Sequence, residues 1–323
     1  MTGSRRQKRE HRKQVKAKKF AANQRKRTAH LIESLQDARD KYSDRWTKNA
    51  EAFSRAGDYA WLAAKLAGYI RVLDVGTGDG RGVAHLLEQG HIVVSIDENP
   101  SCLIKANQYL LDNKYDSQLI LRGNASALQD CVYRINYVPV HSIVPTKGAL
   151  LIEADVLNDG LFVEWAKRAG PFDAVTCWFV GSHAYRRYNG QIPRWVCDTP
   201  QKYRLKMQNT VYELADKVLR ESGVLQISDR IEYPHQQCMI DNEWRLHRKQ
   251  ASVTTLHVED IQYRRIKTVD VVDGVKMGMT AGASGRIPEH IDIAINSVIS
   301  CKQSTNPVAI TDLTPSRFSY QVM

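Results

Sequence analysis

Four glycines lie close together between an apolar run and a helix-forming segment, and they restrict the fold of this 323-residue chain more than any other feature. Residues 71–97 read RVLDVGTGDGRGVAHLLEQGHIVVSID, with glycines at positions 76, 78, 80 and 82. A loop with so few side chains lets another group approach the backbone closely. Such a turn, between a strand and a helix, also offers backbone N–H groups and the positive end of a helix dipole, which suit an anion or a carboxylate.

The segments around this loop predict alternating strands and helices. Strands are expected at 71–75, 91–97, 149–155 and 172–180, and helices at 81–89, at 161–169 and from Asn99-Pro100 onward. This alternation predicts an α/β fold with a doubly wound, mostly parallel sheet.

The third strand has two candidates. QLILRG (118–123) and ALLIEAD (149–155) both qualify, and the second is preferred because a helix and a further strand follow it compactly. Residues 114–148 then form an insertion.

The ends of the chain supply the remaining predicted elements. Two helices are expected before the first strand, at about 31–42 and 47–67. Thr199-Pro200 opens a long helix that leads to the strand VLQISD, and segments 251–271 and 290–299 predict an antiparallel pair that closes the sheet. The expected organisation is a solvated, flexible tail over 1–30, helices over 31–68, the main domain over 69–301 with its insertion, and a C-terminal tail over 302–323.

A carboxylate at the end of the second strand indicates which ligand the loop holds. Asp97 lies 17 residues after Gly80, where it can accept hydrogen bonds from both hydroxyls of a ribose. The dinucleotide fingerprint G-x-G-x-x-G fails, because its sixth position is Arg81 when counted from Gly76 and Val83 when counted from Gly78. A nucleoside with a negatively charged appendage, other than a dinucleotide, is therefore indicated.

The loop resembles the first motif of class I S-adenosylmethionine-dependent methyltransferases, in which an acid near the strand end precedes glycines at alternate positions. The resemblance covers about residues 60–230 and implies a Rossmann-like, seven-stranded sheet with a final antiparallel strand, and S-adenosyl-L-methionine as cofactor. It implies that Asp74 and the backbone at Gly76, Thr77, Gly78 and Gly80 face the amino-acid portion of the cofactor, with Asp97 on the ribose. It also implies that Asp155-Val156 contacts the adenine, with Asn124-Ala125 as the weaker rival, and that Cys177, Trp178 and Phe179 lie near the methyl group.

Methyl transfer from a sulfonium is an in-line displacement, so positioning matters more than catalytic side chains. The candidates for a base are His183, Tyr185 and Asp229, in that order. Four of the residues singled out have a simpler alternative: Asp155 as a helix cap, Trp178 and Phe179 as core residues, and His183 as a surface histidine. Residues 177–180 read Cys-Trp-Phe-Val rather than an N-P-P-Y-like tetrad, and no Pro-Cys occurs in the chain, so the two common DNA-methylating chemistries are disfavoured.

The charge distribution is the main indication of a partner. The chain carries 46 Lys and Arg against 35 Asp and Glu, yet residues 1–30 alone hold twelve of the basic residues and one acid, so the remainder is balanced. A basic arm can neutralise several phosphates, which favours RNA as acceptor. The alternatives are a localisation or solubility tail, a small-molecule or protein acceptor, and a non-catalytic binding module that kept the cofactor fold.

Composition excludes several other classes. Six cysteines without a C-x-x-C pair argue against a disulfide scaffold or a structural zinc site, and no metal is expected. Charges interrupt every apolar stretch, so no membrane span is expected and a cytoplasmic location is predicted. The sequence indicates no particular oligomeric state.

Overall fold

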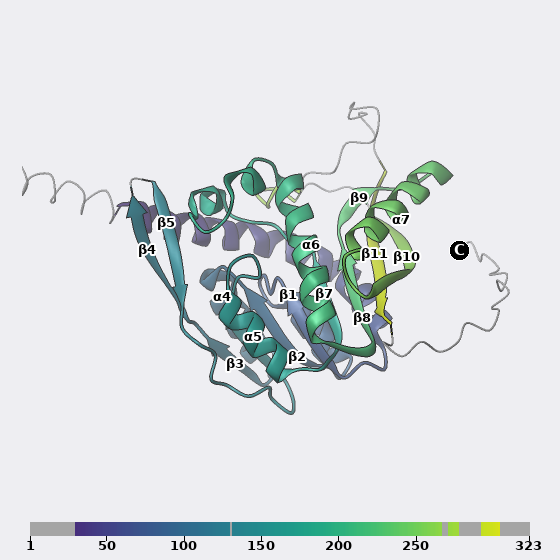
Figure 1. Ribbon diagram of the computed structural model, residues 1–323, viewed down its shortest axis with the longest axis horizontal. Helices are drawn as coiled ribbons and strands as arrows, with labels where there is room; N and C mark the ends of the chain where they lie inside the picture. Colours follow the sequence, from purple (N-terminus) through teal and green to yellow (C-terminus); the bar gives the residue numbers. More distant parts are fainter. Residues whose placement is uncertain (1–29, 130, 267–270, 278–291, 304–323) are drawn as a thin grey trace, which may run out of the picture.

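The structure is a computed structural model that describes residues 30–129, 131–266, 271–277 and 292–303. One large sheet forms its centre (Figure 1). Its strands are β1 (Arg71–Val75), β2 (Ile92–Asp97), β3 (Ser117–Ile120), β6 (Ala149–Glu153), β7 (Phe172–Trp178), β8 (Leu219–Ser228), β9 (Arg230–Glu232), β10 (Leu256–Ile266) and β11 (Ile293–Lys302). The strand order is β10-β11-β8-β7-β1-β2-β6-β3, and β9 pairs with β11.

The sheet is parallel at its centre and antiparallel at one end. β1 pairs in parallel with β2 and β7, and parallel pairing continues outward through β6 to β3 and through β7 to β8. β11 runs antiparallel to both β8 and β10. The predicted doubly wound sheet and its closing antiparallel pair are therefore confirmed, while β3 and β9 extend the expected seven strands in the described part of the chain.

Both candidates for the third strand belong to the sheet. β6 occupies the place next to β2, as preferred from the sequence, and β3 pairs with its outer edge. Residues 123–137 then form a separate two-stranded hairpin of β4 (Gly123–Gln129) and β5 (Val132–Tyr137). The range expected to be an insertion thus supplies an edge strand and a hairpin.

Helices cover both faces of the sheet. α3 (Arg81–Glu88) and α4 (Pro100–Asp112) share one core cluster with the N-terminal helix, and α5 (Gly160–Ala169) and α6 (Pro200–Val218) share the other. The helix starts predicted from proline are confirmed: the side chains of Asn99 and Thr199 accept hydrogen bonds from the backbone N–H groups of Ser101 and Lys202. A further helix, α7 (Gln237–Ala251), had no sequence prediction.

One continuous helix, rather than two, precedes the first strand. Residues 30–55 are helical, followed by α2 (Asp58–Ala63) and a short 3₁₀ turn at Ala64–Leu66. The predicted break near residue 45 is wrong because Trp46, Ala50 and Phe53 continue the buried stripe begun by Leu35. The helix ends instead at Gly57, whose φ of 74° is left-handed. In Figure 1 this purple helix runs from the β4–β5 hairpin across the sheet.

No helix in the described ranges is long and apolar enough to cross a membrane. Within the same ranges, no group of three or more His, Cys, Asp or Glu side chains is arranged to hold a metal ion.

Candidate functional site

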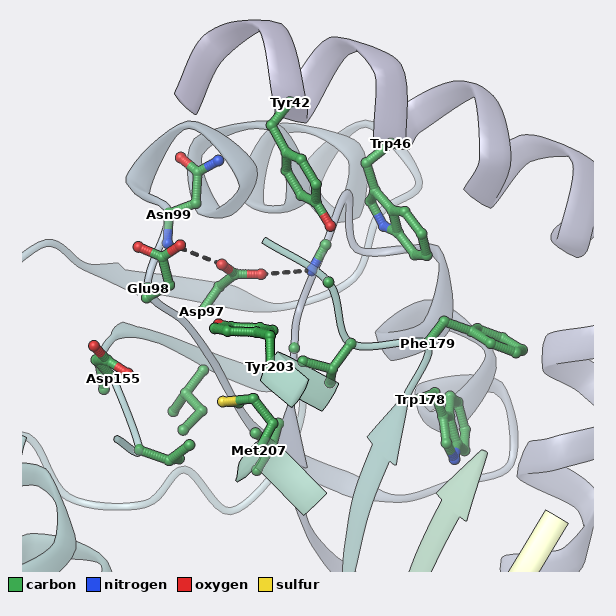
Figure 2. A pocket seen from close by; sticks show the side chains of 18 residues that line it. Tyr42, Trp46, Asp97, Glu98, Asn99, Asp155, Trp178, Phe179, Tyr203 and Met207 are labelled. Atoms are coloured by element: carbon green, nitrogen blue, oxygen red, sulfur yellow. Dashed lines mark hydrogen bonds between the residues drawn. The ribbon is translucent and has the colours of Figure 1, made fainter. Parts of the chain in front are cut away.

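A cleft enclosing about 580 Å³ of empty space lies at the carboxyl ends of β1, β2, β6 and β7 (Figure 2). Ligands of open α/β sheets bind at this edge, because loops from adjacent strands diverge there. Six of the sequence-predicted cofactor residues line the cleft: Gly76, Gly78, Asp97, Asp155, Val156 and Trp178. The other four, Asp74, Thr77, Gly80 and Cys177, are not among its lining residues.

Asp97 is fixed at the centre of the cleft by two backbone N–H groups. Gly78 N donates to Oδ2 at 3.0 Å, and Asn99 N donates to Oδ1 at 2.9 Å (Figure 2). Burial nevertheless raises the pKa of Asp97 to about 7. Its oxygens keep lone pairs that can accept hydrogen bonds from hydroxyl groups.

The glycine loop uses its N–H groups internally, which differs from the expectation. The N–H groups of Gly76 and Thr77 both donate to the carbonyl of Ile96, and that of Gly80 donates to Thr77. These three N–H groups are therefore not available to a ligand, and what the loop offers at these positions is space. Gly80 has a φ of 88°, and a Cβ there would lie 2.9 Å from the backbone of Ala106 in α4, so this glycine serves packing.

Asp74 lies inside the sheet instead of facing the cleft. Its two oxygens accept hydrogen bonds from the hydroxyls of Ser95 and Thr176, each at 2.6 Å, and the Thr77 hydroxyl is 2.7 Å from that of Ser95. Burial raises the pKa of Asp74 to about 6. This carboxyl group joins β1 to its neighbours on both sides, β2 and β7.

Aromatic side chains of the N-terminal helix cover the cleft. Tyr42 and Trp46 point down toward the glycine loop in Figure 2. A Cβ on Gly78 would lie 2.3 Å from the indole nitrogen of Trp46, and one on Gly181 would lie 2.5 Å from the Tyr42 hydroxyl. The loop is thus bare of side chains where this helix approaches it.

Two other aromatic residues that precede the first strand, Tyr59 and Trp61, do not line the cleft. Tyr59 packs against Phe53, Trp178 and Phe179, and Trp61 stacks with Lys65. Trp178 also donates from its indole nitrogen to Gln226 at 3.2 Å. Cys177 is buried in the opposite core cluster, with a pKa that burial raises.

Arg186 forms ion pairs with Asp155 and Glu98, two acids on the side of the site where the adenine is expected. It is 1% exposed, its Nη2 lies 2.5 Å from Asp155 Oδ2, and its Nη1 lies 3.7 Å from Glu98. His183 Nε2 lies 3.2 Å from Glu98 as well. Burial alone would raise the pKa of Glu98, but Arg186 and His183 outweigh it and hold that pKa well below its usual range. Arg186 is therefore a buried ion-pair partner of these two acids.

A second chamber, of about 850 Å³, adjoins the cleft and shares several wall residues with it: Tyr42, Trp46, Phe179, Val180, Gly181 and Tyr203. His183 and Asp229, two of the predicted base candidates, line this second chamber. The third, Tyr185, packs against Tyr188 and the hairpin cluster and is not among the lining residues.

Residues 271–277, the strap, form part of the wall of the second chamber through Val275, Lys276 and Met277. The strap is attached to the N-terminal helix. Asn49 exchanges two hydrogen bonds with the backbone of Val275, at 3.1 and 2.6 Å, and Arg45 donates to the carbonyl of Gly274 at 3.0 Å. The helix and the strap therefore enclose the site together.

Several wall residues were not found from the sequence. Tyr203 and Met207 line the cleft from α6, and Glu98 lies next to Asp97 (Figure 2). Tyr203 and Met207 are both buried residues of α6 and lie four residues apart; the periodicity of the sequence predicts an apolar face that includes Met207, but it did not indicate Tyr203. Glu98 had one available signal, its position directly after the ribose acid.

Comparisons with known proteins yield similarity to solved structures only. No family model matches the chain, and no curated protein matches it. The magnesium protoporphyrin IX methyltransferase of Synechocystis PCC 6803 with bound SAH is 12% identical with a TM-score of 0.39, covering 80% of this chain and 84% of that one. The N-methyltransferase NodS of Bradyrhizobium japonicum WM9 is 10% identical with a TM-score of 0.41, covering 78% and 96%. The precorrin 8w decarboxylase of Methanobacterium thermoautotrophicum is 12% identical with a TM-score of 0.38, covering 75% and 89%.

The fold assignment depends on the sheet itself. β6, β2, β1, β7 and β8 are parallel neighbours, and the last strand, β11, lies antiparallel between β8 and β10. The chain has the Rossmann-like fold of class I methyltransferases. The cleft and the second chamber lie at the carboxyl edge of its parallel strands, where Asp97 ends β2, Asp155 follows β6 and Asp229 follows β8.

Proposed function

We propose that the protein is an S-adenosyl-L-methionine-dependent methyltransferase that holds its cofactor in the cleft and its acceptor in the second chamber. One observation supports this most strongly: the Gly78 N–H donates to Asp97 at 3.0 Å within the cleft. This contact joins the glycine loop to the carboxylate expected on the ribose, so two separate motifs of the sequence converge on one site.

The lining of the cleft fits this cofactor. The Asp97 carboxyl can accept ribose hydroxyl hydrogen bonds, and Val156, Met207 and Tyr203 offer apolar surface for a base. The rings of Tyr42 and Trp46 suit a sulfonium cation, since aromatic faces attract positive charge. The cofactor, when bound, supplies an electrophilic methyl group.

The side chains of this protein then position the acceptor and receive its proton. Tyr42, Trp46 and the strap cover the chambers, which limits the access of water. Asp229 is the favoured proton acceptor. It lines the second chamber, and burial raises its pKa to about 7, close to neutral pH. Its Oδ2 accepts a hydrogen bond from Gln208 at 3.0 Å and lies 3.3 Å from Arg204. His183 is directed at Glu98 and serves better to position that acid.

Calorimetric titration with S-adenosyl-L-methionine tests the cofactor site. The intact protein should bind, and Asp97→Ala and Asp97→Asn should weaken binding by about tenfold or more, the loss expected for hydrogen bonds to a charged group. Glu213→Ala is a matched control, since Glu213 is an exposed carboxylate on α6 that lines neither chamber. As a control, a melting curve should be measured for each variant to check that it folds. Absence of binding by the intact protein would refute the proposal.

Turnover separates an enzyme from a non-catalytic module with the same fold. Transfer of a labelled methyl group to small-molecule, protein and RNA fractions would support catalysis, while binding without transfer to any fraction would favour the module. The expectation of an RNA acceptor depends on the basic segment, of which residues 1–29 lie outside the described residues, and it stays a prediction. RNA retention that falls steeply between 50 and 200 mM salt, and disappears when residues 1–29 are deleted, would support RNA binding.

A further inference from the structure

The second chamber has an uneven set of charges. Apart from tyrosine and cysteine, six ionisable side chains line it: His183, Arg186, Arg187, Arg204, Asp229 and Lys276. Arg186 is balanced by Asp155 and Glu98, and Arg204 is balanced by Asp229. The cations that remain are Arg187 and Lys276.

Arg187 and Lys276 are exposed, and neither forms an ion pair with a carboxylate among the residues that the structure describes. Arg187 lies over the ring of Tyr188 at 5.7 Å, which leaves its N–H donors available to a ligand. The two cations come from distant parts of the chain, the 3₁₀ turn Ala184–Tyr188 and the strap. The strap is fixed by Asn49, so the wall that carries Lys276 is anchored.

One carboxylate oxygen in the same chamber lacks a partner. Asp229 is 5% exposed; Gln208 donates to its Oδ2, and the backbone N–H of Arg230 also acts on this carboxylate and lowers its pKa, but no hydrogen bond of good geometry reaches Oδ1 from the described residues. A buried, unpartnered carboxylate oxygen is costly unless a ligand donates to it. The chamber therefore offers a ligand two kinds of contact. The Asp229 carboxylate can accept a hydrogen bond from an O–H or N–H group, and Arg187 and Lys276 can bind an anionic group.

We propose that the chamber binds a small acceptor that carries a phosphate or carboxylate group and a protonated oxygen or nitrogen. Arg187 and Lys276 contact the anionic group, and Asp229 accepts the proton from the oxygen or nitrogen. The acceptor lone pair forms the new bond to the methyl carbon, the carbon–sulfur bond breaks with its electrons left on sulfur, and the displaced proton passes to Asp229. This inference rests on the proposed function.

The test supplies the full chain with methyl-labelled cofactor and, in separate reactions, a protein-free extract of small molecules and a purified RNA fraction. Label should enter the small-molecule reaction, in a product that an anion exchanger retains at pH 7. The double variant Arg187→Gln/Lys276→Gln should raise the KM for that acceptor by about tenfold or more, with cofactor affinity unchanged. The control Arg248→Gln/Lys249→Gln removes the same charge from exposed positions of α7 and should leave the KM unchanged.

Asp229→Asn supplies a second readout. It should lower kcat more than it raises KM and remove the limb of the kcat profile that rises with pH near neutrality. Label only in neutral or cationic products, label only in RNA, or equal KM values for the two double variants would overturn the inference. Cofactor binding without label in the small-molecule reaction would overturn it while leaving the cofactor site intact. Absence of cofactor binding would instead refute the proposed function.

Discussion

Gly80→Ala should destabilise the protein far more than Gly90→Ala, although both glycines have nearly the same backbone conformation. Their φ angles are 88° and 85°. A Cβ at Gly80 would meet three atoms of Ala106 at 2.9 to 3.0 Å, whereas a Cβ at Gly90 would meet nothing within 4 Å. Comparing the stability losses of the two variants therefore distinguishes the cost of backbone strain from the cost of steric conflict at the glycine loop.

The expected magnitudes follow from these distances. A left-handed conformation costs a residue with a side chain about 1–2 kcal/mol, and this applies at both positions. Overpacking adds about 1–3 kcal/mol, and it applies only at Gly80, where the neighbour includes helix backbone that cannot rotate away. Gly90→Ala should lose about 1–2 kcal/mol and Gly80→Ala about 2–5 kcal/mol.

Urea unfolding of the ligand-free protein, followed by circular dichroism, measures both free energies of unfolding. The effect of the added Cβ on the unfolded chain is the same in both variants, so it cancels in the comparison. Equal losses, within about 0.5 kcal/mol, would refute the conclusion that the glycine loop is pressed against α4. Since Gly80 precedes α3, Gly80→Ala should also weaken cofactor binding, whereas Gly90→Ala should not.

Three further predictions concern buried charges and the strap. Arg186→Met should lower the free energy of unfolding by about 3–5 kcal/mol in urea titrations, because it leaves the buried carboxylate of Asp155 without its cation and removes one of the cations that face Glu98; a loss below about 1 kcal/mol would contradict this. The pKa of Asp97, raised by burial to about 7, exceeds its unfolded value of about 4, so the folded state binds more protons and loses stability as pH rises between these values. The ligand-free protein should therefore melt at a higher temperature at pH 6 than at pH 8, and Asp97→Asn should reduce that difference; an unchanged difference would show that other groups cause it. Asn49→Ala removes two hydrogen bonds to the strap, each worth about 1 kcal/mol, and should speed trypsin cleavage after Lys276; cleavage at the unaltered rate would show that the strap is held by other contacts.

The sequence by itself determined the central sheet, because its signals are local. A glycine after a buried strand specifies the end of that strand within a few residues. Asn99-Pro100 and Thr199-Pro200 each specify the start of a helix in the same way. The alternation of these elements was enough to predict a doubly wound sheet. The position of Asp97 beside the glycine loop also followed, since parallel strands of one sheet end at the same edge.

The tertiary structure decided what surrounds that edge. Tyr42 and Trp46 reach the cleft because one unbroken helix crosses the sheet, and Arg186 reaches Asp155 from 31 residues away. Asp74 faces its neighbouring strands because hydroxyls of Ser95 and Thr176 flank it across the sheet. Such contacts join residues distant along the chain, so they depend on packing and charge pairing that leave no periodic or local pattern in the sequence.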